Sequence, residues 1–153
     1  LPCNILRTLY CSLILPHLSY CNIVWANNFN SRIDKLVRSC RLQKKAVRIV
    51  SKAQFRDHTT PLFRKLNLLT LANINSLQQN MFMFKFFNSS LPPTLQNLFQ
   101  LNISVHGYNT RSCSKAHIPL VKTTLSQHFI TFSGPVSLYH FVNVNHLLFS
   151  NKN

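Results

Sequence analysis

Cationic side chains recur every three or four residues in one segment of the chain. On a helix this spacing places them along one face, and the row would extend about 21 Å at about 1.5 Å per residue. From Lys35 to Arg56 the sequence contains no acid that could neutralise the row. Lys and Arg in such a row hold phosphate groups and position a nucleic acid without reading its bases, although a solvated helix face has the same pattern. The predicted backbone-binding residues are Arg38, Arg41, Lys45, Arg48 and Lys52.

The charge balance of the whole chain supports a polyanionic partner. Its 153 residues include 17 Lys and Arg but only two acids, Asp34 and Asp57, for a formal charge of +15. Eleven of the cations lie between Arg32 and Lys65, so they form a local surface. Two carboxylates are too few to supply the acid, base and metal ligands of most hydrolases and polymerases. We therefore expect no catalytic residue and no small-molecule substrate in this chain.

No set of residues has the spacing of a metal or cofactor site. Cys11, His17 and Cys21 come closest, but structural zinc sites pair cysteines two to four residues apart. The two glycines are far apart and exclude a glycine-rich phosphate loop. We expect no cofactor here. The five cysteines are an odd number without paired spacing, which predicts buried thiols in an intracellular protein of the nucleus or cytoplasm.

Secondary contacts are expected outside the basic row. Arg111 and Lys115 lie in an irregular polar block and are predicted to bind phosphate. Tyr10, Tyr20 and Trp25 could stack on bases, but their helical spacing favours the core.

The helix that carries the basic row is predicted from Ser31 to about Lys52. Ser31 and Asp34 form a capping pattern at its start. A second stripe lies about 150° around the helix from the cations and is mostly apolar. This stripe is the predicted buried face and consists of Ile33, Leu36, Cys40, Gln43, Val47 and Val50.

Further helices are expected on both sides of it. A helix over residues 3–15 should end or kink at Pro16, and a short one should carry Leu18, Cys21 and Trp25 on one face. Others are predicted from Thr60 to Leu66 and from Thr70 to about Asn88. In the last of these, residues 81–87 are apolar nearly all round and should be central to the core.

Beyond residue 100 the helical period fades. Residues 118–121 and 128–132 are predicted to be short strands, the second ended by Gly134-Pro135. The fold class is mainly α, with a small β or irregular C-terminal part. We predict a helical domain over 1–90, a linker with a short helix and a small β or irregular segment over 91–135, and a poorly defined tail over 136–153. A membrane-spanning helix is not expected, because polar residues and Pro16 interrupt the uncharged stretch 8–31.

Four blocks of the sequence resemble the region after the catalytic palm in reverse transcriptases of non-LTR retrotransposons of the Jockey and CR1 type. Residues 9–21 read LYCSLILPHLSYC, and residues 41–49 read RLQKKAVRI. Residues 58–63 read HTTPLF, with LNLL at 66–69, and residues 106–112 read HGYNTRS. The resemblance covers about residues 5–135 in the order of that family.

The resemblance implies a thumb-like helical bundle that contacts the RNA/DNA template–primer duplex. It also implies a palm and fingers of the parent polymerase as partners. The aromatic-Ala-Asp-Asp motif that holds two divalent metals in the family's palm is absent from this sequence. The chain is thus interpreted as a non-catalytic fragment, with the metals expected only in the palm. The alternatives are a stand-alone basic nucleic-acid-binding protein and, less favoured, a membrane-surface protein.

Overall fold

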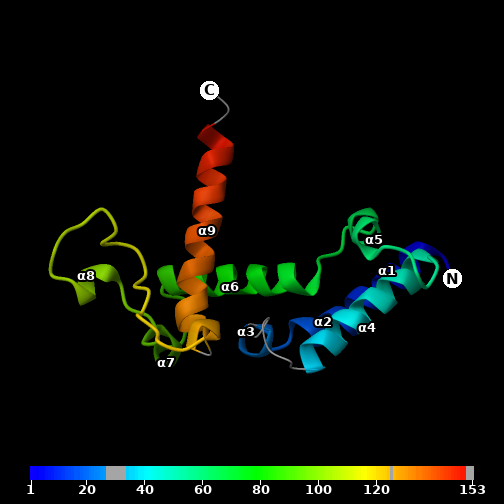
Figure 1. Ribbon diagram of the computed structural model, residues 1–153, viewed down its shortest axis with the longest axis horizontal. Helices are drawn as coiled ribbons and strands as arrows, with labels where there is room; N and C mark the ends of the chain where they lie inside the picture. The colour runs from blue at the N-terminus through cyan, green and yellow to red at the C-terminus, as the bar shows by residue number, and fades with distance from the viewer. Residues whose placement is uncertain (27–33, 125, 151–153) are drawn as a thin grey trace. The chain divides into compact units, whose positions relative to one another are not determined.

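The chain is mainly helical, as the sequence predicts (Figure 1). The computed structural model describes residues 1–26, 34–124 and 126–150, and within 34–37 and 141–150 it describes the backbone alone. In these ranges the only pairing of extended segments is an isolated antiparallel bridge between Leu101 and Ala116. Two compact units make up the chain, Leu1–Asn75 and Ser76–Asn153.

An almost continuous helix begins the first unit. It consists of α1 (Cys3–Leu9), a wider π-helical turn η1 (Tyr10–Ile14) and α2 (Leu15–Ser19). Pro16 has no N–H to donate, and Leu15 before it donates to the carbonyl of Tyr10, five residues back. A π turn of this kind absorbs a break in the regular hydrogen-bond ladder. The helix therefore continues through Pro16 instead of ending there.

A sharp turn separates α2 from the short helix α3 (Asn22–Trp25). Cys21 in this turn has a φ of 48°, in the left-handed region. The predicted single helix with Leu18, Cys21 and Trp25 on one face is therefore divided in two. The Nδ2 of buried Asn22 donates to the carbonyl of Leu18 at 2.8 Å, which ties α3 back to α2.

Helix α4 (Asp34–Ser51) packs against α1 and η1 and carries the predicted basic row. The predicted cap Ser31, the start of the predicted helix and the side chains of Ile33 and Leu36 lie outside the described residues. At the other end, the N–H of Lys52 donates to the carbonyl of Ile49 and the N–H of Ala53 to that of Arg48. This paired bonding is a Schellman motif, and it ends the helix at Ser51.

Two further helices complete the first unit. They are α5 (Thr59–Lys65) and the start of α6 (Leu71–Phe87), each within one or two residues of its predicted bounds. The Oγ1 of Thr70 accepts the N–H of Asn73 at 3.4 Å, as expected of a capping residue. One buried cluster joins η1, α4 and α5, and it consists of Tyr10, Val47, Val50, Phe63 and Leu66.

The second unit is built around the rest of α6. It also contains α7 (Pro93–Gln96), α8 (Asn102–Val105), the 3₁₀ turn η2 (Ser126–His128) and α9 (Ile130–Ser150). Figure 1 shows α9 crossing α6. At the crossing, the Oγ of Ser137 donates to the Oδ1 of Asn80 at 3.2 Å. The core of this unit comprises Met83, Phe86, Phe99 and Ala116.

The predicted strand over 128–132 is wrong, and so is the break at Gly134-Pro135. Both glycine and proline lie inside α9. A Cβ at Gly134 would lie 2.9 Å from the Sδ of buried Met83, so the missing side chain lets α9 approach α6 closely. Pro135 is fully buried as well. Packing against α6 thus outweighs the one backbone hydrogen bond that Pro135 removes.

The predicted strand over 118–121 is also wrong. These residues have no regular secondary structure. Pro119 lacks an N–H for a ladder, and the side chain of Leu120 is 95% exposed. The nearby bridge stops after the N–H of His117 donates to the carbonyl of Gln100 at 2.7 Å. An extended segment without a pairing partner does not become a strand.

Residues 81–87 are only partly central to the core. Met83 and Phe86 are buried, but Met81 is 52% exposed and Phe84 67% exposed. The first unit ends at Asn75, within α6, and α9 extends from Ile130 to Ser150.

Candidate nucleic-acid interface

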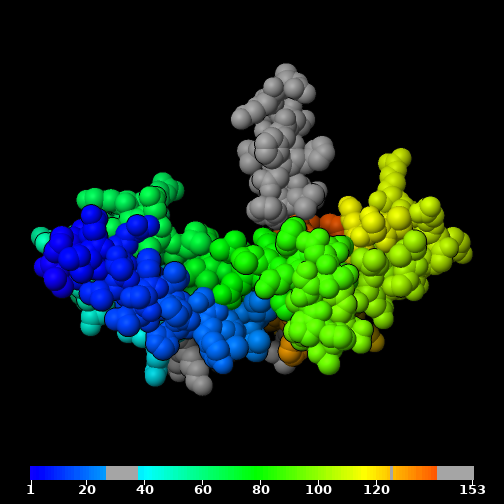
Figure 2. Space-filling view, turned by 180° about the vertical axis from the view of Figure 1, so that it is seen from behind, coloured from blue at the N-terminus to red at the C-terminus, as the bar shows by residue number. Residues whose placement is uncertain are grey.

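The buried side of α4 holds the helix in a fixed orientation. Gln43, Val47 and Val50, all predicted for this side, are at most 5% exposed. The N-terminal helices cover this side, and in Figure 2 only the edge of α4 (cyan) emerges beside them (blue). Side chains about 150° around the helix therefore point to solvent.

Gln43 anchors α4 through three hydrogen bonds. Its Nε2 donates to the Oη of Tyr10 at 3.0 Å and to the carbonyl of Leu69 at 2.9 Å. Its Oε1 accepts the N–H of Leu71 at 2.9 Å. One side chain thus joins α4 to η1, to the loop before α6 and to the first residue of α6. Buried polar groups that are satisfied in this way fix one packing arrangement over others.

The predicted basic row lies on the surface. Four of its side chains are exposed and Arg48 is half-buried. Lys52 follows the helix with a φ of 53°, so it extends the row from the turn after α4. With the helix oriented by its core, the row presents its positive charges along one side. The exposed members are Arg38, Arg41, Lys45 and Lys52.

Arg48 also holds the loop that follows α4. Its Nε donates to the backbone carbonyl of Asp57 at 3.1 Å. The carboxylate of Asp57 accepts the N–H of Gln54 at 2.8 Å and so closes the turn. Arginine has five N–H donors, so Arg48 can support this loop and still contact an anion.

The first unit exposes further cations besides the predicted row. Lys44 is about 40° around α4 from Arg48, on the side toward α5. Burial raises the pKa of the Cys40 thiol, and the ammonium of Lys44 opposes that rise, so the two groups are close. The sequence signal for these residues is the clustering of eleven cations between Arg32 and Lys65. The added cations, all exposed, are Lys44, Arg56, Arg64 and Lys65.

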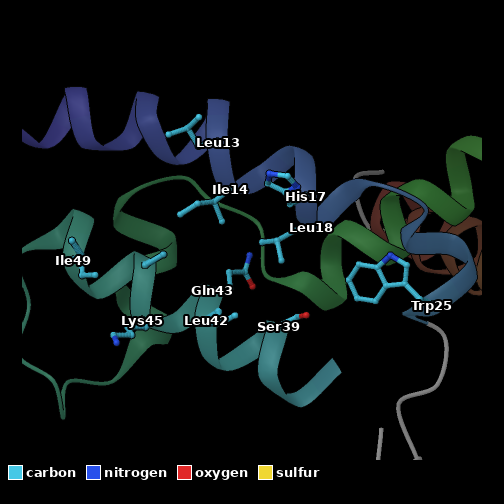
Figure 3. Close-up of a pocket in the computed structure, with 11 residues that line it drawn as sticks. Leu13, Ile14, His17, Leu18, Trp25, Ser39, Leu42, Gln43, Lys45 and Ile49 are labelled. Carbon is cyan, nitrogen blue, oxygen red and sulfur yellow. The ribbon is translucent and has the colours of Figure 1, made fainter. Parts of the chain in front are cut away.

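An apolar groove of about 460 Å³ lies on the other side of the row. Figure 3 shows Ile14 and Leu18 facing α4 across this groove, with Trp25 at one end. Leu42 and Ile49 on its α4 side are 65% and 60% exposed. The basic row is therefore bordered by exposed apolar side chains.

Arg111 and Lys115 belong to the second unit. Both are exposed. The Nζ of Lys115 lies 5.0 Å from the centre of the Tyr139 ring, a cation–π contact. Its charge is thus held over an aromatic face and remains at the surface.

The aromatic residues have different environments. Tyr10 is 2% exposed and belongs to the core, as predicted, whereas Tyr20 is 76% exposed, contrary to the prediction. The Nε1 of half-buried Trp25 donates to the carbonyl of Tyr20 at 2.7 Å. This bond holds the indole against the protein.

In the part of the chain that the structure describes, neither a metal-binding cluster nor a membrane-spanning helix is found. No cluster of three or more His, Cys, Asp or Glu side chains there could hold a metal ion. In the same residues, no helix has both the length and the apolar character needed to cross a membrane. No protein family, characterised protein or solved structure matches this chain.

Proposed function

We propose that the chain binds the sugar–phosphate backbone of an RNA/DNA template–primer duplex through the basic face of α4. It would do so as a non-catalytic C-terminal part of a non-LTR retrotransposon reverse transcriptase, an RNA-directed DNA polymerase. One observation carries the binding proposal: four predicted cations of α4 and Lys52 just after it lie at the surface, and the opposite side of this helix is buried. The sequence resemblance supplies the identity of the duplex.

The binding chemistry is electrostatic. Each phosphate that a Lys or Arg neutralises releases condensed counterions, so binding weakens as salt rises. Five such contacts on a B-form duplex give a slope of about −4.5 in a plot of log K against log salt. Polymerisation itself would take place in the palm of the parent enzyme, where carboxylates hold divalent metals.

The test compares two double variants of the full chain in a salt titration of duplex binding. Arg41→Gln with Lys45→Gln removes two cations of the row. Lys85→Gln with Lys122→Gln removes two exposed cations of the second unit. We expect the first pair to reduce the magnitude of the salt slope by about 1.8 and the second to leave it nearly unchanged. Equal effects of the two pairs would contradict the proposal.

Two other functions use the same face. A stand-alone basic nucleic-acid-binding protein would bind a blunt-ended DNA duplex as tightly as an RNA/DNA template–primer of equal length.

A membrane-surface protein is favoured by one observation, the exposed Leu42 and Ile49 beside Lys45. Co-flotation with anionic liposomes that is unaffected by nuclease would support this last function.

A further inference from the structure

A groove of about 570 Å³ with a mixed polar and apolar lining lies between α4, α5 and the beginning of α6. It is on the α5 side of the basic row, in the first unit, and is separate from the apolar groove of Figure 3. Its volume is in the range of about 300–1,000 Å³ that is usual for pockets that bind small molecules.

Two cations line this groove, and no acid is among its lining residues. Lys44 comes from α4 and Arg64 from α5, and both side chains are exposed. Hydrogen-bonding groups surround them. These are the hydroxyls of Thr59, Thr60 and Thr70 and the amides of Asn67 and Asn73. Ammonium, guanidinium, hydroxyl and amide groups together are the donors that proteins use to hold phosphate oxygens.

The lining also contains an apolar part. Phe63 is buried there, and Leu69, which is 46% exposed, lies with Leu68 beside the polar groups. A simple inorganic anion would gain nothing from this surface. A nucleotide unit has a charged phosphate and a base with an apolar face, so it matches both parts of the lining.

The groove continues from the basic row. Lys44 immediately precedes Lys45 in α4, and Arg64 of α5 lines the same groove as Lys44. Because Lys44 is about 40° around the helix from Arg48, a phosphodiester strand that passes Arg48 would meet Lys44 at the groove that Arg64 also lines. The groove is large enough for a single nucleic-acid strand, whereas a duplex is too wide to enter a space of this volume.

We propose that this groove binds the backbone of a single-stranded segment that extends from the duplex held on α4. The proposal rests on the proposed function, because it takes the duplex on the basic row as its starting point. Lys44 and Arg64 contact the phosphates. The threonine and asparagine side chains donate hydrogen bonds to them.

The experiment compares the full chain on a blunt duplex and on the same duplex with a single-stranded extension of about eight nucleotides. Two single-strand phosphate contacts add about 1.4 to the magnitude of the salt slope. The variant Lys44→Gln with Arg64→Gln should lose this increment. The matched control, Arg56→Gln with Lys65→Gln, removes two exposed cations that do not line the groove and should keep it.

The outcomes separate the two proposals. If the blunt duplex binds but the extension adds no slope, or if the Lys44 and Arg64 variant keeps the increment, the groove proposal is overturned and the proposed function stands. If neither nucleic acid binds, both fail. Lys44→Arg with Arg64→Lys retains both charges and should restore the increment, which shows that charge and not folding was lost.

Discussion

The side-chain amide of Gln43 donates a hydrogen bond to the hydroxyl of Tyr10 at 3.0 Å, across 33 positions of sequence. Both side chains are 2% exposed. Because Gln43 lies on the buried side of α4, this bond helps to fix the rotation of α4 about its axis. The cations on the opposite side of the helix therefore face solvent. The accessibility of the basic row thus depends on Gln43, a neutral and buried residue on the opposite side of the helix.

Replacement of Gln43 by alanine should destabilise the first unit strongly. The change leaves the N–H of Leu71, the carbonyl of Leu69 and the hydroxyl of Tyr10 without this partner. Unsatisfied buried groups cost about 1–3 kcal/mol each, so we expect a loss of about 3 kcal/mol or more in the free energy of unfolding. Urea denaturation followed by circular dichroism measures it. Gln54→Ala, at an exposed position, is the control and should change stability little; an equally small effect at Gln43 would refute the anchoring role.

The titration of Tyr10 should make the free energy of unfolding depend on pH in the alkaline range. Burial raises its pKa above the usual 10.0, and the hydrogen bond from Gln43 opposes that rise. The neutral phenol is therefore favoured in the folded state. The neutral phenol contributes in full to the free energy of unfolding at pH values below the pKa of Tyr10 in the unfolded chain. This contribution is lost as the pH rises through the higher pKa of Tyr10 in the folded protein. Above about pH 10, the wild-type free energy of unfolding should fall more steeply than that of Tyr10→Phe. Tyr108→Phe, at an 81% exposed position, should follow the wild type; parallel curves for all three would contradict the prediction.

Lys52→Gly should stabilise the fold and weaken binding. Lys52 has a φ of 53°, a conformation that costs a non-glycine residue about 1–2 kcal/mol. Part of the gain is offset by the greater freedom of glycine in the unfolded chain, so we expect an increase of about 1 kcal/mol. The lost charge should reduce the magnitude of the duplex salt slope by about 0.9. Asn67→Gly, at a φ of 50°, should stabilise less, because asparagine tolerates the left-handed backbone conformation better than lysine. If neither variant is stabilised, the left-handed conformations of Lys52 and Asn67 would be contradicted.

Gly134→Val should disrupt the crossing of α6 and α9. A Cβ there would lie 2.9 Å from the Sδ of Met83 and 3.3 Å from the Cδ1 of Ile130. Overpacking of this kind costs about 1–3 kcal/mol. Gly107→Val is the matched control, because nothing lies within 4 Å of a Cβ at Gly107. Thermal denaturation of the two variants tests the difference, and equal melting temperatures would rule out close packing at Gly134.

Local pattern predicted α4 well. Its apolar and basic residues recur at helical spacing on opposite faces of the helix. In the structure Val47 and Val50 are buried, and Arg38 and Lys45 are exposed. The same reasoning failed for residues 128–132. Their aromatic and β-branched side chains favour a strand, but α9 begins at Ile130, and Ile130 packs against the buried cluster of Met83, which lies about 50 positions earlier in the sequence.

The mainly helical fold and the opposite placement of the basic row and the buried stripe on α4 follow from residues within a few turns of one another, so they can be predicted from local sequence. The hydrogen bond from Gln43 to Tyr10 and the groove that Lys44 and Arg64 both line could not be predicted in that way. Those relationships join helices that are distant in the chain. They depend on which surfaces pack together, which a local period does not specify.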